Sequence, residues 1–274
     1  MNYSDEFFEK KSRELKATCI KLAHAGKEGH LNGALSSVDL LIALYYGFLN
    51  IDPRDPKHPE RDRLLFSKGH ACVSLYAILA DRGFIPKSWL DRYASNDTPL
   101  PSHPCVHALP VLETSAGSLG HGMGIASGIS YSLKMRNQSS RVVALISDGE
   151  CNEGSTWESA MFANTHQLSN LTVIVDFNGI QSVGTTAQIM GSAHSVKDKF
   201  EAFGWDAILA NGHDIPELIG LLNRTNDHKA KPKAIIAQTV AGSGVSFMEN
   251  QVLWHYRVPS AEDVSRAMVE LGQA

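Results

Sequence analysis

Residues 141–155 read RVVALISDGECNEGS, and residues 171–181 read LTVIVDFNGIQ. Each stretch opens with a β-branched, apolar run, which is typical of a strand buried on both faces of a parallel sheet. Asp148 follows the first run and Asn178 follows the second, thirty residues further along the chain. Parallel strands end at the same edge of a sheet, and that edge binds ligands in open α/β folds. We therefore expect both side chains at one ligand site.

Asp148 and Asn178 also carry suitable atoms for a cation. A carboxylate, a side-chain amide and a nearby loop carbonyl suit a hard divalent cation such as Mg²⁺, which keeps its remaining positions for water and phosphate oxygens. The competing interpretation is a pair of turns, since Asp-Gly and Asn-Gly commonly mark them. The position of both residues directly after apolar runs favours the metal site.

Further strands and helices are indicated on both sides of this block. Apolar runs predict strands at 64–66, 205–209 and 233–240, and helical patterns predict helices at 4–25, 37–46, 71–82, 193–203, 215–222 and 261–272. Ser4 and Ser260 stand at N-cap positions, and a glycine-rich loop over 26–33 precedes the second helix. This alternation predicts an α/β fold with a mostly parallel sheet flanked by helices. Because no internal repeat or low-complexity linker is present, residues 1–274 are interpreted as a single domain.

Composition and charge argue against several other classes of protein. Hydrophobic residues make up 43% of the chain and charged residues 20%, values typical of a folded globular domain. The net charge is −4 without a basic block, which argues against nucleic-acid binding. No apolar stretch approaches the roughly 20 residues that span a bilayer, and the charged N-terminus lacks the apolar centre of a signal peptide. The four cysteines are scattered without a CxxC pair, so we expect free thiols in a cytoplasmic protein rather than disulfides or a zinc site.

Residues 117–124 read GSLGHGMG and lead into a predicted helix that runs towards Arg136. Glycines allow backbone N–H groups to approach a phosphate, and the N-terminus of the following helix favours negative charge. Glycines also occur where helices pack closely, so the pattern alone has two interpretations. A dinucleotide fingerprint is not indicated, because residues 109–116 do not supply the preceding strand that it requires.

The stretch from Ser147 to Asn178 resembles the metal- and diphosphate-binding motif of thiamine-diphosphate enzymes, usually written Gly-Asp-Gly…Asn-Asn. Ser147 stands in place of its first Gly and Phe177 in place of its first Asn, and both changes spare the two side-chain ligands. Other segments, in one order along the chain, are similar to the transketolase branch of that superfamily: GHLNGALS (29–36), SKGHA (67–71), SHP (102–104), GSLGHG (117–122), DGECNEG (148–154) and WE (157–158). The resemblance covers nearly all of residues 1–260.

This resemblance implies a thiamine-diphosphate-binding fold, here the diphosphate-binding domain, with thiamine diphosphate and Mg²⁺ (or another divalent cation such as Ca²⁺ or Mn²⁺) as cofactors. The implied metal ligands are Asp148, Asn178 and the backbone carbonyl of Ile180. The residues expected to contact the cofactor are His70, Gly117, Ser118, Leu119, Asp148, Gly149, Glu150, Glu153, Asn178, Ile180 and His255. Glu153 and Glu158 match acidic residues that link cofactor sites across a subunit interface in the family. Acidic residues also favour the first turns of a helix, and the two interpretations are compatible.

Four histidines match family positions that line the funnel to the reactive ring of the cofactor: His30, His70, His103 and His255. They are expected to be catalytic, because breaking a carbon–carbon bond beside a carbonyl requires a hydroxyl proton to leave and return. A neutral imidazole can move such a proton near physiological pH, and it can hydrogen-bond sugar hydroxyls. Tyr256 follows His255 where the family commonly has Gly, so a bulky ring is expected beside the funnel.

Length supplies the last prediction, because the 274 residues carry the motifs of only the first of three domains found in ordinary family members. The resemblance implies the N-terminal subunit of a split transketolase. A C-terminal subunit with the pyrimidine-binding and C-terminal domains would complete it in an (αβ)₂ assembly. That enzyme would transfer a two-carbon ketol unit from a ketose to an aldose, with sugar phosphates as substrates. Two alternatives stay open: a related enzyme that acts on a specialised sugar, and a non-catalytic cofactor-binding or regulatory subunit.

Overall fold

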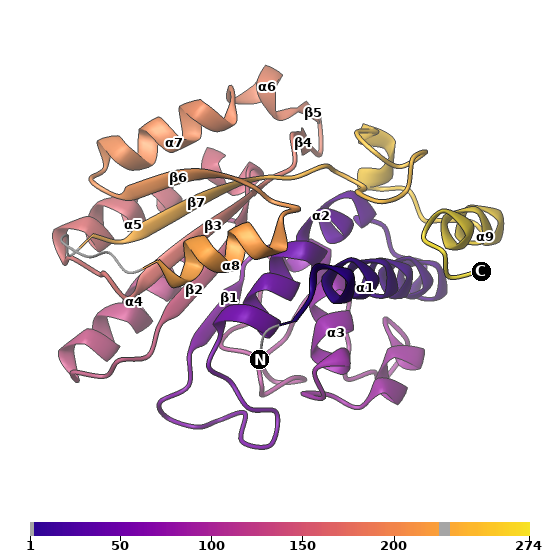
Figure 1. Cartoon of the computed structure of the whole chain (residues 1–274), viewed down its shortest axis with the longest axis horizontal. Coiled ribbons are helices and arrows are strands. Elements are labelled where there is room, and N and C mark those ends of the chain that lie inside the picture. Colours follow the sequence, from indigo (N-terminus) through magenta and orange to yellow (C-terminus); the bar gives the residue numbers. More distant parts are fainter. Residues whose placement is uncertain (1–2, 225–230) are drawn as a thin grey trace.

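The computed structural model describes residues 3–224 and 231–274, and its centre is a five-stranded sheet (Figure 1). The strands lie in the order β1-β2-β3-β7-β6, and each neighbouring pair in this sheet is parallel. Their bounds are Arg63–Phe66 for β1, Val142–Ser147 for β2, Leu171–Phe177 for β3, Lys233–Gln238 for β7 and Asp206–Asn211 for β6. The predicted α/β fold with a mostly parallel sheet flanked by helices is confirmed.

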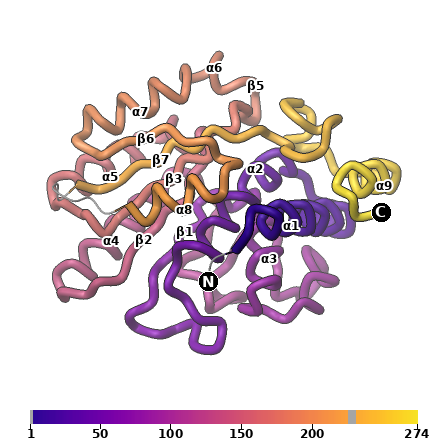
Figure 2. Tube along the Cα trace, in the orientation of Figure 1, coloured from indigo at the N-terminus to yellow at the C-terminus, as the bar shows by residue number. Residues whose placement is uncertain are grey.

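Helices cover both faces of the sheet, as the trace in Figure 2 shows. One apolar core joins the sheet to α1 (Asp5–Gly26), α2 (Leu31–Ile42), α3 (Cys72–Asp81), α8 (Ile215–Asn223) and α9 (Ala261–Glu270). The second core joins it to α4 (Gly122–Met135), α5 (Gly154–Thr165) and α7 (Ala193–Ala202). Within β2, Val143 and Leu145 belong to the first core, while Ala144 and Ile146 belong to the second. Both faces are buried, which explains why the run is apolar throughout.

Helices α1 and α9 begin where the sequence predicted. The hydroxyl of Ser4 accepts a hydrogen bond from the backbone N–H of Phe7 at 3.2 Å and caps α1. Ser260 caps α9 in a reciprocal capping box with Asp263. Both caps satisfy backbone donors that a helix start leaves free, so both N-cap predictions are confirmed.

Helix α2 begins at Leu31, inside the predicted 26–33 loop, so that prediction was wrong for its last three residues. His30 precedes the helix with a left-handed backbone, φ 63°. Gly33 in the first turn is a packing residue, because a Cβ at this position would lie 3.3 Å from Nε2 of His70. The glycine allows the helix to pack closely against His70. In the sequence this glycine could not be told apart from a glycine of a loop.

Helix α2 continues as a π-helical segment, Ala43–Phe48. The combined stretch Leu31–Phe48 is long and apolar enough to cross a membrane by length and composition alone, so the prediction that no apolar stretch approaches a bilayer span was wrong in that respect. In this fold 89% of that stretch is buried inside the protein. It packs against α1, α3 and β3, in the manner of a core helix.

Several short elements that the sequence did not predict lie around the carboxyl edge of the sheet. They are η2 (Gly69–Ala71), η4 (Gly149–Asn152), β4 (Ile180–Gln181), β5 (Gly184–Thr185), α6 (Thr186–Ile189) and η5 (Val252–His255). A further short helix, η3, covers Lys87–Arg92. Strands β4 and β5 form an antiparallel pair directly after β3. These elements are too short to show a period in the sequence, yet they place much of the candidate site.

Candidate active site

A cavity of about 400 Å³ lies at the carboxyl edge of β1, β2 and β3. It is lined by His30, Gly33, Lys68, His70, His103, Gly117, Leu119, Ser147, Asp148, Gly149, Asn152, Glu153, Asn178, Ile180, Gln181, Ser182 and His255. Of the residues that the sequence assigned to the site, only Ser118 and Glu150 are outside this lining. Segments that are far apart in the sequence therefore meet at one edge of the sheet, as expected for an α/β fold.

Asp148 and Asn178 are neighbours because β2 and β3 are parallel and in register, with Ser147 opposite Asp176. Asp148 is only 2% exposed, and its carboxylate accepts hydrogen bonds from the backbone N–H groups of Gly149 at 2.8 Å and Gly179 at 3.2 Å. The amide oxygen of Asn178 accepts from the N–H of Ile180 at 3.0 Å, and its amide nitrogen donates to Ser36 at 3.2 Å.

The electrostatics of Asp148 fit a cation. Burial, with a smaller contribution from the charge of Asp176, raises the pKa of Asp148 to about 6, although a hydrogen bond from Thr186 and the charge of Lys68 act in the opposite direction. A buried carboxylate is stabilised in its charged form by a bound metal ion, which makes the donor set chemically suitable for one. Within residues 3–224 and 231–274, no group of three or more His, Cys, Asp or Glu side chains could hold a metal. The predicted ligand set differs from such a group, because it combines one carboxylate with one side-chain amide and one backbone carbonyl.

Two buried polar atoms at the cavity lack a hydrogen-bond partner within the described residues: Nδ1 of His30 and Nε2 of Gln181. Gln181 is held by Asn152, whose amide donates to its Oε1 at 2.9 Å. A buried donor without a partner costs free energy, and a ligand can recover that cost. Gln181 and Asn152 are cavity residues that the sequence analysis did not assign.

Glu150 has a structural role that the sequence analysis did not anticipate. Its fully buried carboxylate accepts hydrogen bonds from the hydroxyl of Ser67 and from the N–H groups of Gly120 at 3.0 Å and Ser147 at 3.1 Å. Burial raises the pKa of Glu150, and these donors counteract the shift. Glu150 therefore fixes the glycine loop beside β1 and β2. Cofactor contacts by Glu150 and by the exposed Ser118 stay predictions.

Gly120 shows why the 117–124 loop is rich in glycine. Its φ is +84°, and a Cβ there would lie 2.7 Å from the Cβ of Glu153. Both the backbone conformation and the space exclude a larger residue. The loop thus packs against the start of α5, as the close-packing interpretation of its glycines requires. Gly117 and Leu119 line the cavity, and phosphate binding by the loop stays a prediction.

The four predicted histidines share the cavity. The ring centroids of His30 lie 5.3 Å from His70 and 5.2 Å from His255, and those of His70 and His255 are 5.9 Å apart. The backbone N–H of His30 donates to the carbonyl of His255 at 3.0 Å, which joins the start of α2 to the segment before α9. His103 lines the cavity from an exposed loop.

Burial keeps three of these imidazoles uncharged. It lowers the pKa of His70 well below its usual value, that of His255 to about 4, and that of His30 by a smaller amount. The charge of Lys68 and the neighbouring imidazoles contribute to the lowered pKa values of His70 and His255. A neutral imidazole holds one N–H donor and one acceptor nitrogen, so it can take a proton from one oxygen or hydrogen-bond another.

Tyr256 lies at the rim and does not displace His255. Its ring centroid is 4.8 Å from that of His255 and 5.6 Å from that of His30, and the residue is 59% exposed. A Cβ on Gly29 would lie 2.5 Å from the backbone oxygen of Tyr256, so the two backbones pack closely here. The predicted bulky ring beside the funnel is therefore present, with His255 still facing the cavity.

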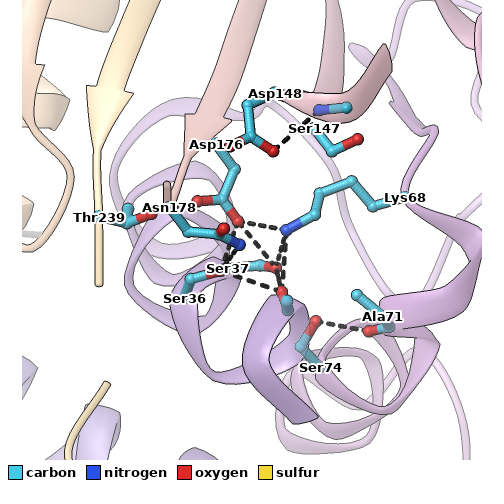
Figure 3. A network of polar contacts seen from close by, with 12 residues as sticks. Ser36, Ser37, Lys68, Ala71, Ser74, Ser147, Asp148, Asp176, Asn178 and Thr239 are labelled. Atoms are coloured by element: carbon cyan, nitrogen blue, oxygen red, sulfur yellow. Dashed lines mark hydrogen bonds and ion pairs between the residues drawn. The ribbon is translucent and has the colours of Figure 1, made fainter. Parts of the chain in front are cut away.

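The sequence analysis missed the charged centre beneath the site. Lys68 and Asp176 are both 0% exposed and form an ion pair (Figure 3). Both residues stand within motifs that were quoted for other reasons, SKGHA and DFN. A lysine two residues before a conspicuous site histidine, with an acid directly after a buried apolar run, was the available signal.

The fold and the cavity together define an α/β domain with a ligand-sized cavity at the carboxyl edge of its sheet, lined by four imidazoles. Residues 9–274 match the protein family described as "Transketolase, thiamine diphosphate binding domain". The chain belongs to this family, and its fold is the thiamine-diphosphate-binding fold that the sequence predicted.

Individual relatives agree with this assignment. The chain is 37% identical over 271 residues to an apulose-4-phosphate transketolase subunit of Actinobacillus succinogenes, with 98% of each chain covered. It is 36% identical over 243 residues to a 6-deoxy-6-sulfo-D-fructose transketolase subunit of Clostridium sp., covering 89% of this chain and 88% of that one. The solved transketolase of Campylobacter jejuni superimposes with a TM-score of 0.91 at 28% identity, covering 99% of this chain. The chain spans 43% of that longer protein.

Proposed function

We propose that the chain is the N-terminal subunit of a split transketolase, which transfers a two-carbon ketol unit from a ketose to an aldose with thiamine diphosphate. The observation that carries this proposal is one cavity that combines the Asp148–Asn178 edge with the neutral imidazoles of His30, His70 and His255. The split into subunits is supported by relatives that are named as transketolase subunits and match this chain over nearly their whole length.

At the metal-binding side, Asp148, Asn178 and the carbonyl of Ile180 would hold Mg²⁺, or Ca²⁺ or Mn²⁺ in its place. The N–H groups and short side chains around Gly117, Leu119 and Gly149 would hold the diphosphate of the cofactor. When bound, thiamine diphosphate supplies the electron sink that makes cleavage of a carbon–carbon bond beside a carbonyl possible. The unpartnered Nε2 of Gln181 gives this side a further donor.

The histidines would handle the sugar. His30 and His70 face one another across the deeper part of the cavity, where either can accept the proton of a sugar hydroxyl and return it. His255, whose ring centroid lies 5.2 Å from that of His30, and His103 on its exposed loop would orient other hydroxyls. Burial lowers the pKa values of His30, His70 and His255 and keeps these three rings neutral, so each of the three offers both a donor and an acceptor at physiological pH.

The remaining parts of the active site would come from a C-terminal partner chain with the pyrimidine-binding and C-terminal domains, in an (αβ)₂ assembly in the cytoplasm. Glu153 and Glu158 are exposed at the start of α5, where they are accessible to another chain. In this arrangement the partner supplies the glutamate that activates the cofactor, as in the family, so the chain alone should have no ketol-transfer activity.

A specialised sugar is the second candidate substrate. Two relatives carry names that refer to apulose 4-phosphate and to 6-deoxy-6-sulfo-D-fructose rather than to common pentose phosphates. Tyr256 at the rim also differs from the Gly that the family commonly has there. A non-catalytic role is disfavoured, because the cavity retains every histidine and both side-chain metal ligands that the resemblance implies.

The test is ketol transfer from xylulose 5-phosphate to ribose 5-phosphate with Mg²⁺ and thiamine diphosphate. The chain is assayed alone and then with a partner that carries the C-terminal domains, taken from the neighbouring gene. Activity in the mixture only is the expected result. Activity of the chain alone would remove the need for a partner. If the mixture binds the cofactor but transfers nothing from pentose phosphates, apulose 4-phosphate and 6-deoxy-6-sulfo-D-fructose are the next donors to assay. If the mixture also fails to bind the cofactor, the proposal is wrong.

A further inference from the structure

Lys68 lines the cofactor cavity, yet its ammonium group is not available to a ligand. It forms the ion pair with Asp176 and donates to the carbonyl of Gly33 at 2.8 Å and to the hydroxyl of Ser37 at 3.0 Å. An ammonium group has three N–H donors, and all three are used by these contacts. Lys68 therefore holds neighbouring residues in place.

Asp176 also accepts hydrogen bonds from neighbouring segments (Figure 3). One carboxylate oxygen accepts from Lys68 and from the hydroxyl of Ser36 at 2.7 Å, while the other accepts from Thr239. These partners lie on α2, on the turn after β1 and after β7, and Asp176 itself is in β3. One buried carboxylate thus joins the first turns of α2 to the ends of the central strands.

Ser36 connects this charged pair to the candidate metal site. A hydroxyl has a single hydrogen, and the charged Asp176 at 2.7 Å is a stronger acceptor for it than the carbonyl of Gly33 at 3.2 Å. The oxygen of Ser36 is then left as an acceptor, and it receives the amide N–H of Asn178 at 3.2 Å. The direction of donation is fixed along the whole series, from Asn178 to Ser36 to Asp176, with Lys68 neutralising the carboxylate.

We propose that Ser36, anchored by the Lys68–Asp176 pair, is a positioning residue that holds the amide nitrogen of Asn178, while the N–H of Ile180 holds the amide oxygen, and so keeps this amide in its metal-binding orientation. The N–H₂ group is held on the Ser36 side, so the carbonyl oxygen must point away from it. Outer partners of this kind orient metal ligands, and their loss typically weakens metal binding by about 10–100-fold. The inference rests on the proposed function, since it assumes that Asn178 binds a cation together with thiamine diphosphate.

The choice of cation provides a signature that a purely structural role would not produce. Mg²⁺ requires nearly ideal octahedral geometry, whereas Ca²⁺ accepts variable geometry and more ligands. Release of the Asn178 amide should therefore weaken Mg²⁺ more than Ca²⁺. Loss of fold stability alone would weaken both cations to the same degree.

The experiment uses the chain with its C-terminal partner and saturating thiamine diphosphate, and titrates Mg²⁺ and Ca²⁺ separately by calorimetry. Ser36→Ala is expected to weaken Mg²⁺ binding about 10–100-fold and Ca²⁺ binding less. Ser74→Ala is the matched control, because Ser74 is a buried serine of α3 whose hydroxyl donates to the carbonyl of Ala71 at 2.9 Å and touches neither Asn178 nor Asp176. It should leave both affinities close to those of the wild type.

Ser36→Cys keeps the shape of the side chain but weakens the acceptor, so it covers the case in which the alanine variant does not fold. It should give an intermediate loss of Mg²⁺ affinity. Wild-type Mg²⁺ affinity in Ser36→Cys, or equal losses in Ser36→Ala and Ser74→Ala, would overturn the inference and leave the proposed function intact. If the wild-type complex binds neither cation, the proposed function and the inference fail together.

Discussion

The two ends of the cavity respond to burial in opposite directions. At the metal end, formed by Asp148, Asn178 and Ile180, burial raises the pKa of Asp148 to about 6. At the histidine end, formed by His30, His70 and His255, burial lowers the pKa values, that of His255 to about 4. The same loss of water leaves one end with a buried carboxylate that a bound cation would stabilise, and it keeps the other end free of positive charge. Desolvation is thus common to both ends, and the residue type decides the chemistry.

The largest expected effect is a loss of activity when an imidazole is removed from the histidine end while the metal end stays intact. His70→Gln should lower kcat/KM of the assembled enzyme by about 10²–10⁴-fold, the range in which a general acid or base contributes. Mg²⁺ affinity should change little, because His70 does not contact Asp148 or Asn178. The exposed His58→Gln is the control and should retain wild-type kinetics. Parallel losses of activity and of Mg²⁺ affinity would show that the two ends are not independent.

Lys68→Met should damage both ends at once, because it leaves Asp176 charged, buried and without its partner. Removing one member of a buried ion pair costs about 3–5 kcal/mol, which chemical denaturation would detect. Adding Asp176→Asn should recover most of this loss, since no unpaired charge is left. Lys10→Met, at a side chain that is 70% exposed, is the control and should change the free energy of unfolding little. A double variant that is less stable than Lys68→Met would contradict this account.

Asp148→Asn sharpens the comparison at the metal end. It should weaken Mg²⁺ binding by at least about 100-fold, which exceeds the usual cost of losing an outer partner. Without a cation, the variant should unfold at the wild-type temperature or above it, because it no longer buries a carboxylate. Thermal unfolding with and without Mg²⁺ measures both effects, with the exposed Asp198→Asn as control. An equal gain from Mg²⁺ in wild type and variant would exclude Asp148 as a ligand.

The smallest expected effect is a pH dependence at the histidine end. The folded protein holds His255 neutral down to a pKa of about 4, whereas the unfolded chain takes up the proton near 6.5. The unfolded state therefore binds more protons between these values, so stability falls as the pH drops from 6.5 to 4. His255→Gln should show a shallower loss over this window when unfolding is followed in denaturant. A slope equal to that of the wild type would mean that His255 is not the responsible group.

Features that depend on a single segment of the chain, such as strands and helix caps, could be predicted from the sequence. The runs before Asp148 and Asn178 indicated the strands, and the parallel arrangement then placed both residues at one edge, as observed. The caps at Ser4 and Ser260 were equally local. The cavity also contains the four histidines, whose assignment relied on resemblance, since a lone histidine carries no positional information.

Properties that depend on pairs of distant residues escaped prediction. Lys68 and Asp176 are 108 positions apart, and no sequence feature at either residue indicates that the other is its partner. Glu150 stands in the expected motif, but its partners Ser67 and Gly120 direct its carboxylate away from the cavity. Gly33 resembled a loop glycine because the imidazole of His70, which makes it necessary, is supplied by another element. In each case tertiary contacts decided the role of the residue.

The hydrogen bond from His30 to His255 has a consequence for how the protein folds. It joins two residues that lie 225 positions apart (255 − 30) and that both line the cavity. A nascent chain must therefore reach residue 255 before any complete pocket exists. Contacts between such distant segments also slow folding, because the intervening loop must be ordered first. A complete set of cavity residues therefore comes together only when these two segments pair.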